Sequence, residues 1–252
     1  MGKRYFGLCG SSPAWLIAEI ASSAKQVLLI CKDKRSVESI EADLRFFLGS
    51  EQVLVFSDWD ILPFEPLSPQ AFISADRIAT LNGLLTRKNY VCVTSIDTLA
   101  QKILEPSFIE STKFEIYKNS PLERDALRAK LSALGYSEVS LVEETGECAI
   151  RGSVVDIFAS GLSKPVRVHF DAGSIAAIKT FDPDSQRTLD EIHSFLLLPV
   201  KEYSFDFCPF QEIVFAIKLR AKELEVPPRE VARITRALRI GTHFPGVELF
   251  QS

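Results

Sequence analysis

The stretch QVLLICKDKRSVESIEADLRFFL (26–48) decides the fold of the first part of the chain. Residues 26–31 form a continuous apolar run, as expected of a strand that is buried on both faces. Residues 36–48 repeat apolar side chains at helical spacing, on a face built by Val37, Ile40, Leu44 and Phe47. The stretch therefore predicts a buried strand followed by a helix that covers the sheet.

The same alternation continues along the chain. VLVF (53–56) and YVCVT (90–94) are typical of strands, and FISADRIATLNGLL (72–85) between them is typical of a helix. Ser95 is placed to cap a short helix that runs to Leu104. Strands that alternate with covering helices build a parallel sheet, so we expect residues 1–104 to form an α/β domain.

Residues 105–199 follow a different pattern and predict a separate α+β domain. SPLERDALRAKLSALGY (120–136) reads as one helix, with Ser120 as its cap, Pro121 as its first residue and Gly135 at its end. A series of short strands follows, comprising ECAIRG (147–152), SVVDIF (153–158), PVRVHFD (165–171), SIAAIKTFD (174–182) and SFLLLPV (194–200). A lone helix followed by a run of strands favours a largely antiparallel sheet.

Residues 200–252 return to helix, in PFQEIVFAIKLRAKEL (209–224) and PPREVARITRALRIG (227–241). The last residues, VELFQS (247–252), carry apolar side chains with no further element to pack against. We therefore expect the chain to be a fragment of a longer protein.

The composition indicates a globular, cytoplasmic protein. Of 252 residues 46% are hydrophobic and 25% charged, and the net charge of −4 offers no overall attraction to nucleic acid or an anionic membrane. The five cysteines are an odd number without a CxxC pair, which favours reduced thiols over disulfides or a zinc site. No run of 18 apolar residues predicts a membrane-spanning helix.

GLCGSSPAWLIAEI (7–20) has the layout of a phosphate-binding loop, which follows the pattern GxxxxGK[ST]. Gly7 and Gly10 keep two turn positions, but Ser12 replaces the second loop glycine, Pro13 the lysine and Ala14 the magnesium-binding hydroxyl. Proline removes a backbone N–H group as well as the charge. We therefore expect no catalytic ATP binding here, and we interpret Ser12 as the cap of a helix that begins at Pro13.

Other motifs have simpler explanations. LDEIH (189–193) imitates a helicase DExH box, but a polar, turn-like segment precedes it where that box needs a buried strand. The three histidines lie in unrelated segments, so a metal site is not expected. A row of basic side chains falls on one helical face at Arg229, Arg233 and Arg236. It suits phosphate contacts, but a solvated face is favoured because Val231, Ile234 and Leu238 lie opposite.

Two arginines of the α+β domain share the outward side of one sheet. Strand alternation turns Arg151 outward on 147–152, and it turns Arg167 outward on 165–171 while Phe170 points inward. Arginine is enriched at protein-binding hot spots, so these residues suit a protein-docking surface, although exposed strand arginines are more often only solvated.

The sequence also resembles a known family over nearly its whole length from Gly7. SDWDILPFEPLSPQ (57–70), SADRIATL (74–81), ERDALRAKLSALGY (123–136), GECAIRGSVVDIF (146–158) and FDPDSQRTLDEI (181–192) closely resemble the N-terminal region of bacterial transcription-repair coupling factors (Mfd). That region is itself similar to the nucleotide-excision repair protein UvrB. The resemblance weakens after about Phe207.

The resemblance implies a RecA-like α/β domain with a degenerate phosphate loop, an inserted α+β domain similar to domain 2 of UvrB, and a helical segment, 200–252, that returns to the first domain. UvrB has an intact phosphate loop at the matching position and a DNA-clamping hairpin, for which residues 57–70 are too few. In the family the inserted domain binds UvrA. The full-length proteins are ATP-driven DNA translocases that displace stalled RNA polymerase, and the implied ATP and magnesium sites would lie beyond residue 252.

The family's UvrA-docking residues match Arg151 and Arg167. An aromatic residue that the family uses on the later strand is matched by Asp171, with Phe170 one place earlier. We therefore expect a non-catalytic, monomeric, UvrA-recruiting module without its own cofactor. Two alternatives are a UvrB-type ATPase fragment and a module that binds DNA directly through the arginine-rich C-terminal helix.

Overall fold

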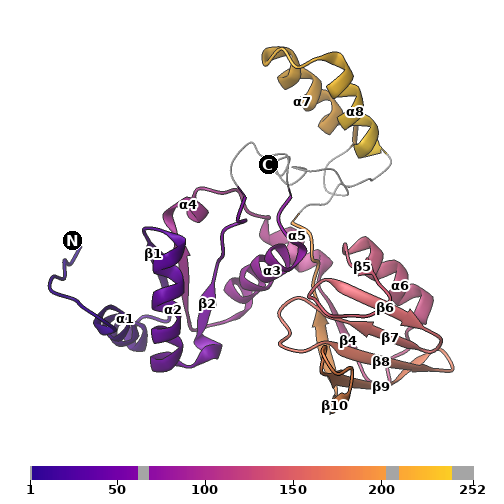
Figure 1. The fold of residues 1–252 in the computed structure, drawn as a ribbon, viewed down its shortest axis with the longest axis horizontal. Coiled ribbons are helices and arrows are strands. Elements are labelled where there is room, and N and C mark those ends of the chain that lie inside the picture. The colour runs from indigo at the N-terminus through magenta and orange to yellow at the C-terminus, as the bar shows by residue number, and fades with distance from the viewer. Residues whose placement is uncertain (1, 62–67, 203–209, 240–252) are drawn as a thin grey trace.

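A computed structural model describes residues 2–61, 68–202 and 210–239 of the chain (Figure 1). The helices are α1 (Ser12–Ser23), α2 (Lys34–Leu48), the 3-10 helix η1 (Ser50–Gln52), α3 (Ala71–Thr86), α4 (Ile96–Leu99), α5 (Pro106–Thr112), α6 (Arg124–Ala133), α7 (Phe210–Glu223) and α8 (Pro228–Arg239). The strands are β1 (Gln26–Cys31), β2 (Val53–Val55), β3 (Tyr90–Ser95), β4 (Phe114–Tyr117), β5 (Ser137–Glu138), β6 (Glu147–Arg151), β7 (Val154–Ile157), β8 (Val166–Asp171), β9 (Ser174–Phe181), β10 (Thr188–Ile192) and β11 (Ser194–Leu197).

The first unit is built on a small parallel sheet. Its strand order is β1-β3-β2, and β3 pairs in parallel with both neighbours, so that Cys92 lies between Leu28 and Leu54. Each connection between these strands passes through a helix, which is the arrangement predicted from the alternating sequence. The prediction of an α/β unit with a parallel sheet is confirmed.

The two faces of this sheet are covered to different extents. Helices α1 and α2 pack on the face that carries Val91 and Val93, in a core that includes Ala14 and Leu44. On the opposite face, α3 and α5 cover β2 and β3. They leave β1 uncovered there, with Leu28 55% and Ile30 45% exposed. The prediction that residues 26–31 are buried on both faces is wrong, because α3 and α5 lie over β2 and β3 and leave one face of β1 uncovered.

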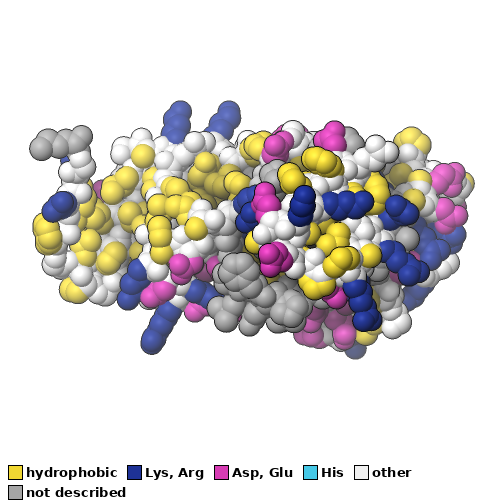
Figure 2. All heavy atoms as spheres, turned by 90° about the horizontal axis from the view of Figure 1, so that it is seen from above, with side chains coloured by type: hydrophobic (Ala, Val, Ile, Leu, Met, Phe, Trp, Pro, Cys, Tyr) yellow, Lys and Arg dark blue, Asp and Glu magenta, His cyan; other side chains and the backbone are white. Residues whose placement is uncertain are grey.

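Figure 2 shows, from above, hydrophobic side chains at the surface of the part of the molecule that the parallel sheet and its helices build. Two local predictions about the helices of this unit also need correction. In α2, Phe47 is 39% exposed and packs against Phe46, while Leu48 completes the buried face. Ser95 does cap α4 by accepting a hydrogen bond from the Thr98 N–H group, but α4 ends at Leu99 and not at Leu104.

The second unit is built on a six-stranded sheet in the order β10-β9-β8-β7-β6-β5, antiparallel except for the pair of β5 and β6. Helix α6 lies on its inner face, where Leu127 and Leu131 pack against Val155, Val168 and Ile178. A second, two-stranded sheet pairs β4 with β11. The predicted antiparallel α+β unit is confirmed.

Helix α6 begins later than the sequence predicts. Its first residue is Arg124, and Glu123 stands at the cap position. Ser120 donates instead to the Tyr117 carbonyl, and Pro121 bridges to Ser174 of β9, so the predicted cap and first residue are wrong. The predicted end is correct, since Gly135 follows α6 with a φ of +91°.

Helices α7 and α8 pack against each other through Ile217 and Leu238, with Val231 and Ile234 beside them. Arg229, Arg233 and Arg236 are exposed on the other side, and Arg233 pairs with Glu230 of the same helix. The predicted arrangement, with these arginines on one side of the helix and apolar side chains on the other, is confirmed. The expectations for VELFQS, His243 and Cys208 fall outside the residues that the structure describes. Within those residues, none of the helices is both long and apolar enough to cross a membrane.

Candidate protein-docking site

The loop before α1 contains two glycines in left-handed conformations but lacks the lysine and the hydroxyl of a phosphate-binding loop. Gly7 and Gly10 both have positive φ angles, of +74° and +55°. Ser12 is the first residue of α1 and not its cap, since Ser11 holds that position and makes no side-chain cap bond. The Ser12 hydroxyl accepts a hydrogen bond from the Cys9 N–H group and donates to the Cys9 carbonyl, both at 2.8 Å. The predicted capping role of Ser12 is therefore wrong.

A hollow lies between this loop and α2. Gly10, Pro13 and Ala14 line one side, and Lys32, Asp33 and Arg35 are among the residues of the other. Asp33 caps α2 by accepting hydrogen bonds from the Ser36 hydroxyl and the Ser36 N–H group, and these contacts, the hydroxyl first, lower the pKa of its carboxyl group. A carboxylate therefore already occupies the start of α2, and it opposes the approach of an anion to that helix end.

The register of the six-stranded sheet places Arg151 and Arg167 on one face. Arg151 pairs with Val154 on β7, and Asp156, two residues further along β7, pairs with Arg167 on β8. Residues that are paired across strands or separated by two along a strand point to the same side. The shared outward side of the two arginines, inferred from strand alternation, agrees with this register.

The two arginines differ in what surrounds them. Arg167 is held by a two-point ion pair, in which its Nε and Nη2 atoms donate to the two carboxylate oxygens of Asp156 at 2.7 and 2.9 Å. Its guanidinium group lies over the Phe181 ring, 4.6 Å from the centroid, and only 18% of the side chain is exposed. Arg151 is exposed and donates one hydrogen bond to the Ser140 carbonyl. Arg151 is thus the more accessible of the two cations.

Part of this outward face is covered by the chain itself. Ala149 and Phe181 are buried there together with Val142. The backbone carbonyl of Gln186 accepts a hydrogen bond from Arg167, and the side-chain amide of Gln186 donates one to the Val142 carbonyl. The open remainder therefore lies around the row of Arg151, Val154, His169 and Ala177, which crosses β6, β7, β8 and β9.

The other two predicted partner-binding residues lie at the end of β8. Phe170 packs against the inner core. This is the inward orientation that strand alternation predicted. Asp171 is exposed beside the turn to β9, where its carbonyl accepts a hydrogen bond from Ser174. Asp171 therefore brings a negative charge, and no apolar surface, to the position matched with an aromatic residue.

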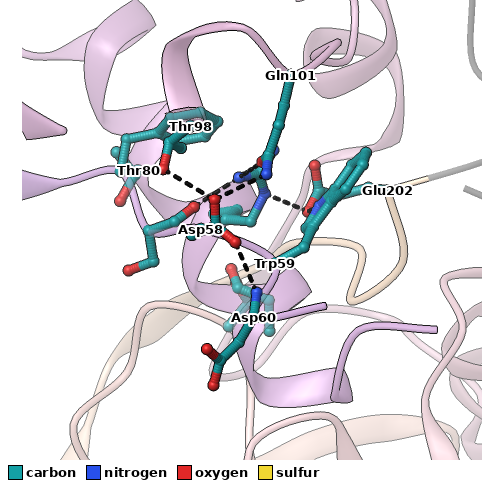
Figure 3. Close-up of polar contacts among 12 residues, drawn as sticks. Asp58, Trp59, Asp60, Thr80, Thr98, Gln101 and Glu202 are labelled. Atoms are coloured by element: carbon teal, nitrogen blue, oxygen red, sulfur yellow. Dashed lines mark hydrogen bonds and ion pairs between the residues drawn. The ribbon is translucent and has the colours of Figure 1, made fainter. Parts of the chain in front are cut away.

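The most elaborate polar cluster of the described residues lies in the first unit and had no predicted role (Figure 3). Arg77 of α3 and Glu202 are both fully buried and form an ion pair of 2.6 Å between Nε and Oε1. The Trp59 Nε1–H group donates to the same Glu202 oxygen at 2.8 Å. The Arg77 guanidinium lies over the rings of Phe56 and Trp59, 4.2 and 4.9 Å from their centroids.

Gln101 extends this cluster to the segment after β2. Its Oε1 atom accepts a hydrogen bond from Arg77 Nη1 at 2.9 Å, and its Nε2 atom donates to Asp58 at 2.9 Å. Asp58 also accepts from the Thr98 hydroxyl and the Asp60 N–H group. Figure 3 shows these side chains converging from separate elements. The cluster therefore joins four separate stretches of the chain, around residues 58–60, 77, 98–101 and 202.

The sequence patterns did not predict this cluster, although two of its stretches, SDWD (57–60) and SADRIATL (74–81), lie in the segments that resemble the coupling factors. A usable signal was present in α3, where Arg77 falls among positions that are otherwise apolar or small, with Ile78 and Leu81 beside it. An arginine inside a helix face that is otherwise buried requires a buried acidic partner. Nothing in the local sequence indicates that the partner is Glu202.

Comparison with known proteins identifies a matching domain family and several similar proteins. Residues 114–203 match the family model described as the UvrB interaction domain. The transcription-repair-coupling factor of Escherichia coli (strain K12) is 32% identical over 245 residues, which is 97% of this chain and 21% of that protein. The protein of the same name from Haemophilus influenzae is 34% identical over 239 residues, 94% of this chain and 20% of that protein. The one from Myxococcus xanthus is 28% identical over 250 residues, 96% of this chain and 21% of that protein. The chain thus spans about a fifth of the length of these relatives.

Proposed function

We propose, from the similarity of nearly the whole chain to about a fifth of the length of bacterial transcription-repair coupling factors, that it is a UvrA-recruiting, non-catalytic module of transcription-coupled nucleotide excision repair. The observation that carries the proposal is an exposed arginine, Arg151, on the open face of a sheet that lies within the match to the UvrB interaction domain. Arg151 would make charge-assisted hydrogen bonds to carboxylates or carbonyls of UvrA.

Arg167 has a different place in this proposal. Its pairing with Asp156 and its contact with the Gln186 carbonyl hold the guanidinium plane, so that one N–H group on each of Nη1 and Nη2 remains for the partner. Removing Arg167 alone would leave a buried carboxylate without its cation, so a loss of binding in that variant could reflect damage to the sheet. The double variant Arg167→Gln with Asp156→Asn removes both charges together.

The test is calorimetric titration of purified UvrA with this chain. Arg151→Ala is expected to weaken binding about tenfold, as truncation of a central interface arginine often does. The Arg167→Gln/Asp156→Asn variant is expected to lose binding to a similar extent while its melting temperature stays close to that of the unmodified chain. Arg236→Ala, an exposed arginine on α8, is the matched control and should bind normally.

Two outcomes would contradict the proposal at different levels. Failure of the unmodified chain to bind UvrA would remove the proposed function. Normal binding by both arginine variants would keep the function but remove this site.

The proposal that the module is non-catalytic rests on the loop before α1. Pro13 and Ala14 offer neither a cation nor a hydroxyl, and Asp33 stands on the other side of the hollow. We therefore expect no heat from titration with millimolar ATP, and a clear ATP isotherm would favour the ATPase alternative. ATP and magnesium would serve the motor of the whole protein, which we propose to be a DNA translocase that displaces stalled RNA polymerase.

A further inference from the structure

We propose that His169 is a further UvrA-contacting residue, which presents a flat ring at the centre of the docking face between the two arginines. This inference rests on the proposed function. It concerns a residue that neither the family match nor the resemblance singles out.

The position of His169 follows from the strand register. His169 pairs with Val154 of β7, and Val154 pairs in turn with Arg151 of β6, so Arg151 lies two strand spacings away, about 10 Å. Arg167 lies two residues before His169 on the same strand, about 7 Å along it. The ring therefore stands within one contact patch with both arginines.

The neighbours of His169 make the centre of this patch apolar. Val154 and Ala177 flank it on β7 and β9, and all three side chains are half-buried. Burial lowers the pKa of His169, and the nearby charges of Lys179 and Arg167 lower it further, against the opposing effect of Asp156. The lowered pKa favours the neutral imidazole, which offers a flat surface to a partner instead of another positive charge.

The rim of the patch indicates what the partner brings. Arg151 lies on one side of the ring, and Lys179, paired with Arg167 across β8 and β9, lies on the other. Asp156 is buried and neutralises Arg167, so Arg151 and Lys179 give the rim a positive charge on both sides of the ring, and exposed Asp171 adds one negative charge at the end of β8. An apolar centre with a charged rim is the usual anatomy of a binding hot spot. The fitting segment of UvrA is therefore one that places an apolar or aromatic side chain on His169 and carboxylates beside it.

The test compares two substitutions of His169 in the full chain, again by titration with UvrA. His169→Ala removes the ring and is expected to weaken binding about tenfold. His169→Phe keeps a flat ring and is expected to bind within about threefold of the unmodified chain. His193→Ala is the matched control, because His193 is an exposed histidine in the turn between β10 and β11, outside the patch.

The outcomes separate this inference from the function on which it depends. If the unmodified chain binds UvrA and His169→Ala binds equally well, the inference is overturned and the function stands. Equal losses in His169→Ala and His169→Phe would also overturn it, since the ring contact would then not be what the partner recognises. Circular dichroism of each variant confirms that the sheet is intact.

Discussion

At the scale of single residues, His169 offers a direct measurement of the environment of the docking face. Its pKa is lowered from the ordinary value of 6.5, first by burial and then by Lys179 and Arg167. Because the unfolded chain takes up the proton at higher pH than the folded chain, this residue contributes stability above about pH 6.5 that is lost as the pH falls. An NMR titration should show His169 with a midpoint below 6.5, raised in Lys179→Ala. A midpoint at 6.5 would mean that the ring is more exposed than the structure shows, and one above 6.5 would mean that the carboxylate of Asp156 outweighs burial and the two cations.

Also at this scale, strand alternation was sufficient to predict that Arg151 and Arg167 share a face, because side chains alternate with a period of two wherever a strand is regular. It could not predict that Asp156 holds Arg167. That contact depends on the pairing of β7 with β8, and the sequence does not specify which strands become neighbours.

At the scale of elements, two serines that look equivalent in sequence have different roles. Ser95 caps α4 and is 3% exposed, whereas Ser120 lies on the surface four residues before α6 begins. Ser95→Ala is expected to reduce the free energy of unfolding by about 1 kcal/mol, as loss of a helix cap commonly does. Ser120→Ala, the matched control, should change it by less than about 0.5 kcal/mol. Urea denaturation measures both, and equal effects would contradict the assigned cap.

The elements themselves were largely predictable, and their surroundings were not. The strands at 26–31, 53–55 and 90–95 follow from local apolar runs. The exposure of Leu28 and Ile30 does not, because it depends on α3 and α5 lying over β2 and β3 and leaving the edge strand uncovered. The start of α6 was missed for a similar reason, since Pro121 is held by a bridge to Ser174 that is remote in sequence.

At the scale of the whole molecule, the Arg77–Glu202 pair links positions 125 residues apart. Removal of one member of a buried pair leaves an uncompensated charge, so Arg77→Ala should reduce the free energy of unfolding by about 3–5 kcal/mol. Replacing both members with apolar residues, Arg77→Met with Glu202→Leu, should restore part of that loss. Arg45→Ala, which breaks a partly exposed pair with Glu41, is the control and should cost less than about 1 kcal/mol. Denaturation followed by tryptophan fluorescence measures all three, and an Arg77→Ala variant as stable as the control would contradict the role of the pair.

The pairing of β4 with β11 has a practical consequence for protein engineering. The chain enters the antiparallel unit at Phe114 and leaves it after Leu197, and these two residues are paired on β4 and β11. The two ends of the segment 114–197 therefore lie next to each other, so this segment is suited to exchange as one unit. It could be exchanged for the corresponding segment of a relative, or replaced by a short linker, provided that Glu202 remains to meet Arg77 and Trp59. Docking specificity could in this way be transplanted between chains without redesign of the parallel sheet.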